Sequence, residues 1–354
     1  MEKTQFKLLG VMSGTSLDGI DILAVKFDFN SGTSYEILHA ATIPYDKTWK
    51  KKLSSAINLK EQELKSLNRE YTQYLGGVLN NFITKNKLHN LDAICSHGHT
   101  VKHEPQNKYT LQIGNLRELA QITGNTLVCN FRVQDVKLGG QGAPLVPIGD
   151  QMLFSEYNYC LNLGGFANIS TEEKNQRIAY DICAVNTVLN YYAGKMAMEY
   201  DEGGKLAASG REIPGLLEKL NTIKFYDEKP PKSLGIEWVN REILPLLSNY
   251  EENIPDILHT YIKHIAFQIS EVVKNSSEVK VLVTGGGTFN DFLMRELGRK
   301  SSAEFVIPSA ELINFKEALI FAFLGALKLR GENNVLKSVT GAKKDHSSGV
   351  IFNP

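Results

Sequence analysis

The sequence lacks a long apolar run and has no excess of charge of either sign. No stretch of the 354 residues comes near the roughly 18 consecutive apolar residues of a membrane-spanning helix, and the N-terminus MEKTQFKLLG has no apolar signal-peptide core. Lys+Arg and Asp+Glu both number 39, so the formal net charge is zero. A neutral chain has no broad electrostatic attraction to nucleic acid or to a membrane surface. We therefore expect a cytoplasmic protein that binds neither.

Cysteine is scarce, and the best-known nucleotide-binding signatures are missing. The four cysteines form no CxxC pair and stand in apolar, strand-like contexts, as reduced core residues of a cytosolic protein do: Cys95, Cys129, Cys160 and Cys183. No segment matches the Walker A pattern or GxGxxG, and there is no HRD and DFG pair of a protein kinase. Any nucleotide site must therefore use other loops.

Length and periodicity favour two α/β domains. A chain of 354 residues with 42% apolar residues exceeds one ordinary core, and its strand-like and helix-like segments alternate. From about Pro147 the opening pattern of strand, glycine turn and strand begins again. We expect a first domain over 1–130, joined by the C-terminal part of the chain from about 316 to 354, and a second domain over 131–315.

The chain is organised around residues 8–29, LLGVMSGTSLDGIDILAVKFDF. Two apolar, strand-like runs flank a polar turn that contains Gly14, Thr15 and Ser16, which predicts a β-hairpin. Successive N–H groups in such a turn form a concave anion site, and Asp18 and Asp21 are suited to a hard cation, directly or through water. An ordinary turn uses the same residue types, so this alternative stays open.

Two further glycine loops follow strands, at Gly164-Gly165 and at 285–287. Together with the first loop they suit a nucleotide clamped between two half-domains, although each alone is typical of a plain turn. Asp181 lies at a strand end, a usual position for a general base. A helix N-cap or an Asx turn before Asn186 explains Asp181 equally well.

Three further sets of polar residues each have a functional and a purely structural interpretation. The spacing of His97, His99 and His103 suits a zinc site, but loop histidines with ordinary hydrogen bonds explain it better. Arg132 and Asp135, beside the glycine-rich segment 139–144, either recognise a polar ligand or pin the loop as an ion pair. Glu317 in the first turn of a helix predicted from residue 316 is also explained by the helix macrodipole.

Taken together, six segments resemble the anhydro-N-acetylmuramic acid kinases, within the sugar-kinase, actin and Hsp70 superfamily. They are GVMSGTSLDGIDI (10–22), SHGHTVKHEP (96–105), NFRVQDVKLGGQGAPLVP (130–147), LNLGGFANIS (161–170), VTGGGTFN (283–290) and KEALIFAFLG (316–325). The first and third are highly specific to the family. The resemblance runs nearly end to end and implies two actin-like, ribonuclease-H-like α/β domains with an interdomain cleft.

The resemblance also implies the site residues. It makes Asp181 the general base and places Arg132, Glu317, His97 and Thr100 on the sugar side. The residues implied for ATP are Gly14, Thr15, Ser16, Leu17, Asp18, Gly19, Ile20, Asp21, Gly164, Gly165, Asn168, Gly285, Gly286, Gly287 and Asn290. No residue is implied as a protein ligand of a metal, and a homodimer is expected.

The chain departs from the family at two places. Many relatives read D-T-G-P-x-N where this chain has Asp181-Ile182-Cys183-Ala184-Val185-Asn186, which puts the ligand contacts of that loop in question. His99 stands where glutamine is usual, and we expect this change to affect sugar preference.

The implied reaction couples two steps. Water, deprotonated by Asp181, attacks C1 of a 1,6-anhydro sugar while O6 takes the γ-phosphoryl group of ATP, with Mg²⁺ neutralising the phosphates. This predicts an ATP- and Mg²⁺-dependent kinase of cell-wall recycling, with an ordinary hexose kinase as the near variant. A metal-dependent hydrolase that uses His97, His99 and His103 is the alternative from another class. A non-catalytic sensor is a third, motivated only by the altered 182–185 loop.

Overall fold

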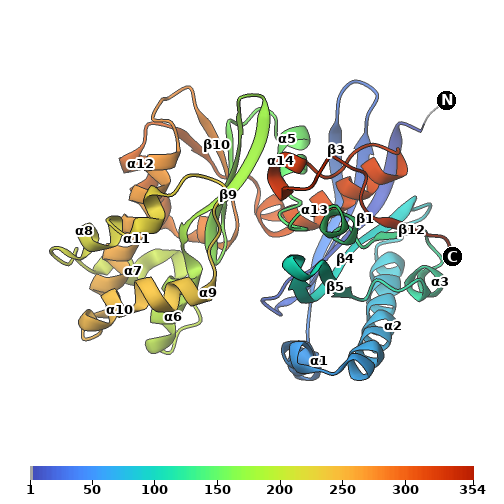
Figure 1. Cartoon of the computed structure of the whole chain (residues 1–354), viewed down its shortest axis with the longest axis horizontal. Coiled ribbons are helices and arrows are strands. Elements are labelled where there is room, and N and C mark those ends of the chain that lie inside the picture. The colour runs from blue at the N-terminus through green and yellow to red at the C-terminus, as the bar shows by residue number, and fades with distance from the viewer. Residues whose placement is uncertain (1–2) are drawn as a thin grey trace. The chain divides into compact units, whose positions relative to one another are not determined.

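The computed structural model describes residues 3–354, and the chain divides into two compact units (Figure 1). Unit 1 ends at Leu153 and resumes over Phe315–Pro354, so the blue N-terminal strands and the red C-terminal segment share it. Unit 2 is Phe154–Asn314. The boundary falls after Leu153 rather than after residue 130. The reason is that the next residues belong to unit 1: Phe131 packs against Phe321, with ring centroids 5.7 Å apart.

Unit 1 contains a seven-stranded sheet in the order β12-β6-β4-β1-β2-β3, with β5 paired to β4. Strands β1, β2 and β3 form an antiparallel meander, and β4 and β6 continue the sheet parallel to β1. Its elements are β1 (Gln5–Ser13), β2 (Gly19–Asp28), β3 (Ser34–Pro44), α1 (Lys47–Ser55), α2 (Glu61–Lys85), β4 (Ala93–Glu104), β5 (Tyr109–Ile113), α3 (Glu118–Thr123), β6 (Leu127–Cys129), α4 (Val133–Lys137), α5 (Pro147–Leu153), α13 (Ala310–Leu329, which begins before the boundary), α14 (Lys337–Thr340) and β12 (Val350–Phe352).

Unit 2 repeats this plan in a five-stranded sheet of order β11-β10-β7-β8-β9. Strands β7, β8 and β9 form the antiparallel meander, and β10 and β11 run parallel to β7. Its elements are β7 (Tyr159–Leu163), β8 (Phe166–Glu173), β9 (Gln176–Ala184), α6 (Asn186–Lys195), α7 (Lys205–Ser209), α8 (Leu216–Asn221), α9 (Ile236–Trp238), α10 (Leu244–Leu247), α11 (Ile254–Val272), β10 (Lys280–Thr284), the short 3₁₀ helix η7 (Gly286–Phe289), α12 (Asp291–Lys300) and β11 (Glu304–Val306). The order β3-β2-β1-β4-β6 in unit 1 and the order β9-β8-β7-β10-β11 in unit 2 follow the same plan, which confirms the predicted pair of ribonuclease-H-like domains.

Helices cover both faces of the unit 1 sheet. On one face lies α2. Five of its residues recur in the sequence at helical spacing, which predicts a buried stripe, and all five are buried in one cluster with residues of β1 and β2: Leu64, Leu67, Tyr71, Leu75 and Leu79. On the other face lies α13, whose backbone approaches β1 so closely that a Cβ on Gly10 would lie 2.0 Å from the Ala318 carbonyl oxygen. Only glycine fits at such a contact. The position of α13 is therefore set by the sheet.

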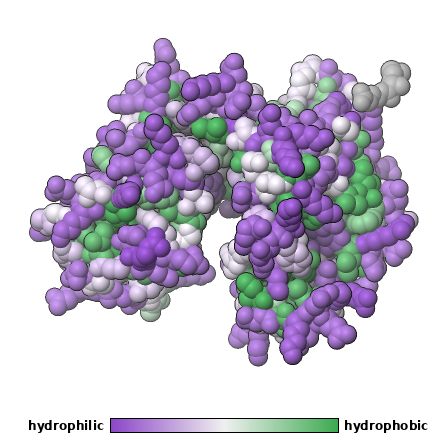
Figure 2. Space-filling model, in the orientation of Figure 1, coloured by the Kyte–Doolittle hydropathy of each residue, from purple (hydrophilic) through white to green (hydrophobic). Residues whose placement is uncertain are grey.

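The cysteines, the surface and the helices agree with what the composition predicts. The four cysteines are free and buried, as predicted. Polar residues cover most of the visible face of each unit (Figure 2). None of the helices within residues 3–354 combines the length and the apolar content that a membrane crossing requires.

Candidate active site

The turn between β1 and β2 has the tight shape expected for an anion-binding loop. The Leu17 N–H donates to the Gly14 carbonyl at 3.4 Å, which closes a four-residue turn, and the Thr15 and Ser16 side chains are exposed. Leu17 has φ of 62°, a left-handed conformation that is rare for a bulky residue. Backbone strain of this kind persists only where the surrounding structure imposes it, and it concentrates at functional sites.

The residues after the turn hold two neighbouring carboxylates at the start of β2. Gly19 pairs with β3 so closely that a Cβ there would lie 2.5 Å from the Ile43 carbonyl oxygen. Asp21 accepts a 2.6 Å hydrogen bond from the Thr42 hydroxyl. Burial raises the pKa of Asp21, and the Asp18 carboxylate raises it further, against the effect of Thr42. The loop thus presents two repelling carboxylates, which a divalent cation would stabilise.

Arg132 follows β6 and is held by two directed hydrogen bonds. Its Nε donates to His97 Nε2 at 2.9 Å, and its Nη1 donates to the Gly142 carbonyl at 2.6 Å. His97 Nδ1 lies 2.8 Å from the Gly98 carbonyl, so Nδ1 carries the hydrogen and Nε2 is free to accept from Arg132. Burial and the Arg132 charge hold the pKa of His97 well below its usual range. His97 is therefore a neutral, buried residue that orients the guanidinium.

Glu317 belongs to a charged group in unit 1, and its position in helix α13 differs from the predicted one. Helix α13 begins at Ala310, so Glu317 lies about two turns inside it, and the macrodipole explanation is wrong. The side chain is exposed, and its carboxylate interacts electrostatically with Arg132 and Asp21. Burial lowers the pKa of Arg132 to about 10, against the opposing effect of Glu317 and then of Asp135. The structure thus brings Arg132, Glu317 and Asp21 into one neighbourhood.

A buried ion pair fixes α13 beside Glu317. Lys316 Nζ lies 2.7 Å from Asp150 Oδ1, and both side chains are nearly inaccessible, at 7% and 5% exposed. One turn further along the same face, Ile320 fills the space beside Gly149, where a Cβ would lie 2.7 Å from its side chain. Helices α5 and α13 are therefore locked together where Glu317 projects.

Asp135 pins the glycine-rich loop through hydrogen bonds and not through the ion pair with Arg132 that one interpretation of the sequence offered. Its carboxylate accepts from the Gly142 N–H at 2.6 Å and from the Thr340 hydroxyl at 2.7 Å. The same Gly142 offers its carbonyl to Arg132. The C-terminal segment therefore helps to hold the loop that positions Arg132.

The three histidines make ordinary hydrogen bonds, as the favoured interpretation expected, and do not form the alternative zinc site. Each bonds a different neighbour: His97 bonds Arg132, His99 Nδ1 bonds the Ser13 hydroxyl at 3.0 Å, and His103 Nδ1 bonds the Thr110 hydroxyl at 3.0 Å. Within residues 3–354 no cluster of three or more His, Cys, Asp or Glu has metal-binding geometry. His99 is buried and bonds Ser13 beside the Gly14 loop, and its effect on sugar preference stays a prediction.

Thr100, predicted on the sugar side, is half-buried at the bulge between β4 and β5. Its hydroxyl accepts a weak hydrogen bond from Gln112 Nε2, at 3.4 Å. It lies one residue beyond His99 on β4.

In unit 2 the two glycine loops lie against each other. Gly285 has φ of 86°, and a Cβ on it would lie 2.6 Å from Asn162 Oδ1; a Cβ on Gly287 would lie 2.8 Å from the Leu163 side chain. Both glycines are thus required by packing against the end of β7. Gly286 is exposed, and Asn290 caps α12 by accepting from the Leu293 N–H at 3.0 Å.

The Gly164-Gly165 turn also supports the start of α6. The Asn186 N–H donates to the Gly164 carbonyl at 3.2 Å, and the Val185 N–H donates to the Gly165 carbonyl at 2.8 Å. These backbone bonds hold the turn against the helix. Residues Ile182–Val185, where the chain departs from the family, are buried, so their side chains fill the core of unit 2.

Asp181 lies in β9 and does not cap the following helix. The N-cap of α6 is Val185, with no side-chain cap bond, so the N-cap explanation is wrong. Asp181 Oδ2 instead accepts from the Leu234 N–H at 2.8 Å, and the Asp181 N–H donates to the Lys232 carbonyl at 3.1 Å. Burial raises the pKa of Asp181, against the effect of the Leu234 bond. A carboxylate whose basicity is raised is suited to general-base catalysis.

A β-bulge turns the strand beside Asp181. The register passes from Ala167 opposite Cys183 to Asn168 opposite Asp181, which leaves Ile182 without a partner. Bulges are common next to active sites, where they redirect a side chain. Asn168, implied for ATP, is exposed and stands directly across from Asp181.

In both units most of these residues gather where the parallel pairing of strands ends. In unit 1, Val11, Ser96 and Cys129 stand side by side, and the Gly14 loop, His97 and Arg132 follow them. In unit 2, Asn162 pairs with Thr284, and the two glycine loops follow. Ala184 pairs with Phe166, the residue directly after the Gly164-Gly165 turn. Asp181 lies three residues before Ala184 on the same strand, so about 10 Å separates Asp181 from the turn. Ligands of open α/β sheets bind outside this edge.

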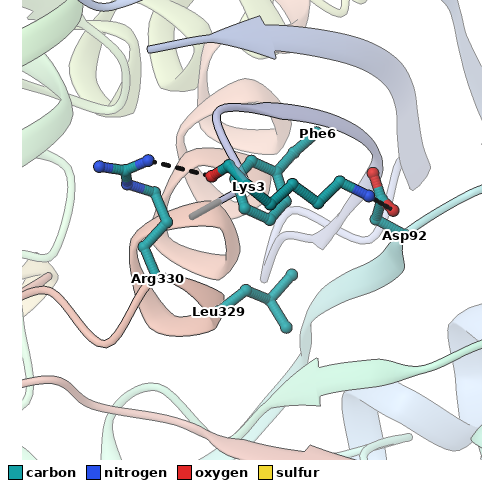
Figure 3. Close-up of a pocket in the computed structure, with 5 residues that line it drawn as sticks. All are labelled: Lys3, Phe6, Asp92, Leu329 and Arg330. Carbon is teal, nitrogen blue, oxygen red and sulfur yellow. Dashed lines mark hydrogen bonds and ion pairs between the residues drawn. The ribbon is translucent and has the colours of Figure 1, made fainter. Parts of the chain in front are cut away.

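A surface pocket on unit 1 does not belong to this set. It has a volume of about 300 Å³ and is lined by Lys3, Phe6, Asp92, Leu329 and Arg330 (Figure 3). Lys3 pairs with Asp92, and its carbonyl accepts from Arg330. Because Phe6 lies near the start of β1 and the Gly14 loop follows the end of that strand, about 25 Å of strand lies between the two places.

Sequence reasoning missed two parts of the site. Tyr45, buried between β3 and α1, bonds Ser13 and thus touches the Gly14 loop. The 232–234 segment supplies the partners of Asp181. Both contacts join residues far apart in the sequence, and no local pattern signals them.

The chain is similar to known proteins over nearly its whole length. The sequence profile of the anhydro-N-acetylmuramic acid kinases matches residues 6–354. The chain is 33% identical to the anhydro-N-acetylmuramic acid kinase of Mannheimia succiniciproducens, over 97% of this chain and 98% of that one. It is 34% identical to that of Pseudomonas syringae pv. tomato, over 98% and 99%. Among solved structures, the activator of 2-hydroxyisocaproyl-CoA dehydratase from Clostridium difficile is similar at TM-score 0.44 and 14% identity, over 92% of this chain and 97% of that one. The match over nearly the whole chain shows that the protein belongs to the anhydro-N-acetylmuramic acid kinase family.

Proposed function

We propose that the protein phosphorylates 1,6-anhydro-N-acetylmuramic acid on O6, with ATP as donor, and opens the anhydro bridge with water, in cell-wall recycling. The observation that carries the proposal is Asp181. It is a partly buried carboxylate of raised pKa, beside a bulge and about 10 Å from a glycine turn, in a chain of this family.

Asp181 takes a proton from a water molecule as the water oxygen bonds to C1. The C1–O6 bond breaks, and O6 bonds to the γ-phosphorus as ADP leaves. The single backbone bond from Leu234 holds Oδ2 and so fixes the direction of the carboxylate. Arg132, oriented by His97, and Glu317 bind the polar groups of the sugar.

The phosphates of ATP bind at residues 14–21, where the turn exposes Thr15 and Ser16. Gly164, Gly165 and Asn168 bind on the phosphate side in unit 2, and Gly285, Gly286, Gly287 and Asn290 bind the adenosine. Asp18 and Asp21, two carboxylates whose mutual repulsion contributes to the raised pKa of Asp21, fit Mg²⁺ held through water. That cation would neutralise charge on the transferring phosphoryl group.

The test is to incubate the protein with ATP, Mg²⁺ and the anhydro sugar, and in parallel with the open-chain sugar. We expect ADP and a 6-phosphorylated product from the anhydro sugar only. ADP with free phosphate would reject the assignment, and equal use of the open-chain sugar would indicate an ordinary hexose kinase. Sugar binding without ADP would favour the non-catalytic sensor. No contact among residues 3–354 supports the metal hydrolase.

We also propose a homodimer in the cytoplasm, as the family resemblance implies. Light scattering on the purified protein tests the dimer. A monomer mass at assay concentrations would reject it.

A further inference from the structure

Tyr45 touches both ends of the Gly14 loop. Its backbone N–H donates to the Asp18 carbonyl at 3.3 Å, and its hydroxyl lies 2.7 Å from the Ser13 hydroxyl. Ser13 and Asp18 flank the four-residue turn closed by Leu17. One buried residue from the connection between β3 and α1 therefore spans the loop from outside the hairpin.

Two more side chains support this contact from the core. The Ser13 hydroxyl also bonds His99 Nδ1 at 3.0 Å, and the Tyr45 hydroxyl bonds the Tyr71 hydroxyl. All four side chains are buried. Buried polar groups cost free energy unless they are paired, so a network that is paired at each member holds one geometry. The strained φ of Leu17 shows that the loop needs such support.

The network is uncharged at neutral pH. Burial raises the pKa of Tyr45 to about 12 and lowers the pKa of His99 to about 4. Neither group exchanges a proton near pH 7. The four residues therefore act by position and not by acid–base chemistry.

We infer that Tyr45 is a positioning residue for nucleotide binding, which sets the shape of the Gly14 loop through Ser13 and Asp18. This inference rests on the proposed function, because it takes that loop as the phosphate-binding loop. The ligand class is a nucleoside triphosphate, and the expected defect is confined to it. Sugar affinity should stay unchanged, since Arg132 and Glu317 do not depend on these bonds.

The test compares Tyr45→Phe with Tyr74→Phe. Both remove one hydroxyl, and the Tyr74 ring is half-buried and lies 6.2 Å from that of Tyr45. We expect Tyr45→Phe to raise the KM for ATP about 10-fold, because it leaves buried partners unpaired. The KM for sugar should not change, and Tyr74→Phe should match the wild type in both. Ser13→Ala breaks the same bond from the other end and should reproduce the ATP defect if Tyr45→Phe does not fold.

A pair of His99 variants adds a graded readout. Gln offers an amide that can bond Ser13, whereas Leu offers none, so His99→Gln should lose less ATP affinity than His99→Leu. Equal KM changes for ATP and sugar, or a fall in melting temperature with both KM values unchanged, would overturn the inference. Calorimetric titration with ATP alone separates the two proposals. If the wild type binds ATP but phosphorylates no sugar, the function fails, while the ATP affinity ratio still decides the role of Tyr45.

Discussion

Replacement of Asp181 by asparagine is the sharpest test of the mechanism. Asparagine keeps the shape and can still accept the 2.8 Å hydrogen bond from the Leu234 N–H through its carbonyl oxygen. It cannot take a proton from water. Loss of a general base costs about 10²- to 10⁴-fold in rate, which is about 2.7 to 5.4 kcal/mol in the barrier. Sugar and ATP affinities should change little, since the missing interaction develops in the transition state.

The assay is steady-state turnover with melting temperature measured on the same samples. Asp181→Ala is the matched control, because it also removes the bond to Leu234. Both variants should lose turnover alike, and only alanine should lower the melting temperature. If Asp181 merely anchors the 232–234 segment, Asp181→Asn will keep near-normal turnover. That result would refute the reasoning.

The pH dependence gives a second check on Asp181. Burial raises its pKa above the ordinary 3.8, so the active carboxylate is lost, as pH falls, at a higher pH than for a solvated aspartate. For stability the sign is opposite to that of a salt-bridged aspartate. Ionisation in the folded state is disfavoured, so wild type should lose stability relative to Asp181→Asn as pH rises through the raised pKa. The two proteins should converge in stability at pH values below 3.8.

Three further predictions concern the scaffold. Arg132→Lys keeps the charge but not the two directed bonds to His97 and Gly142, so the KM for sugar should rise about 10- to 100-fold with the KM for ATP unchanged. Equal changes in the two KM values would contradict a role of Arg132 on the sugar side. Lys316→Met removes the cation that faces buried Asp150 and should lower the free energy of unfolding by about 3–5 kcal/mol, seen as a lower melting temperature. The double variant Lys316→Met with Asp150→Leu should recover part of this loss. No recovery would argue against a stabilising ion pair of Lys316 with Asp150. Gly285→Ala places a Cβ 2.6 Å from Asn162 Oδ1 at positive φ and should lower the melting temperature. The control Gly298→Ala, in helix α12 with open space around it, should raise the melting temperature slightly. Equal effects of the two variants would show that the packing of the two glycine loops is not tight.

The sequence alone determined the features that depend on neighbouring residues. The apolar spacing of α2 predicted which of its side chains are buried, because a helix repeats every 3.6 residues. The alternation around Gly14 predicted the β1–β2 hairpin, because a strand repeats every two. The motifs also predicted the family, since they extend over nearly the whole chain.

Only the tertiary structure decided the features that depend on distant contacts. The boundary between the units lies after Leu153 and not after residue 130, because Phe131 packs on Phe321. Glu317 lies inside α13 and not in its first turn, because the helix begins earlier than residue 316. The N-cap explanation of Asp181 was excluded because its carboxylate bonds Leu234, 53 positions away in the chain, and Val185 stands at the N-cap. Tyr45 carried no local signal, because its role depends on a hydroxyl 32 positions away. Local periodicity reports which face of an element is buried, whereas a polar site is defined by which side chains folding brings within hydrogen-bonding distance.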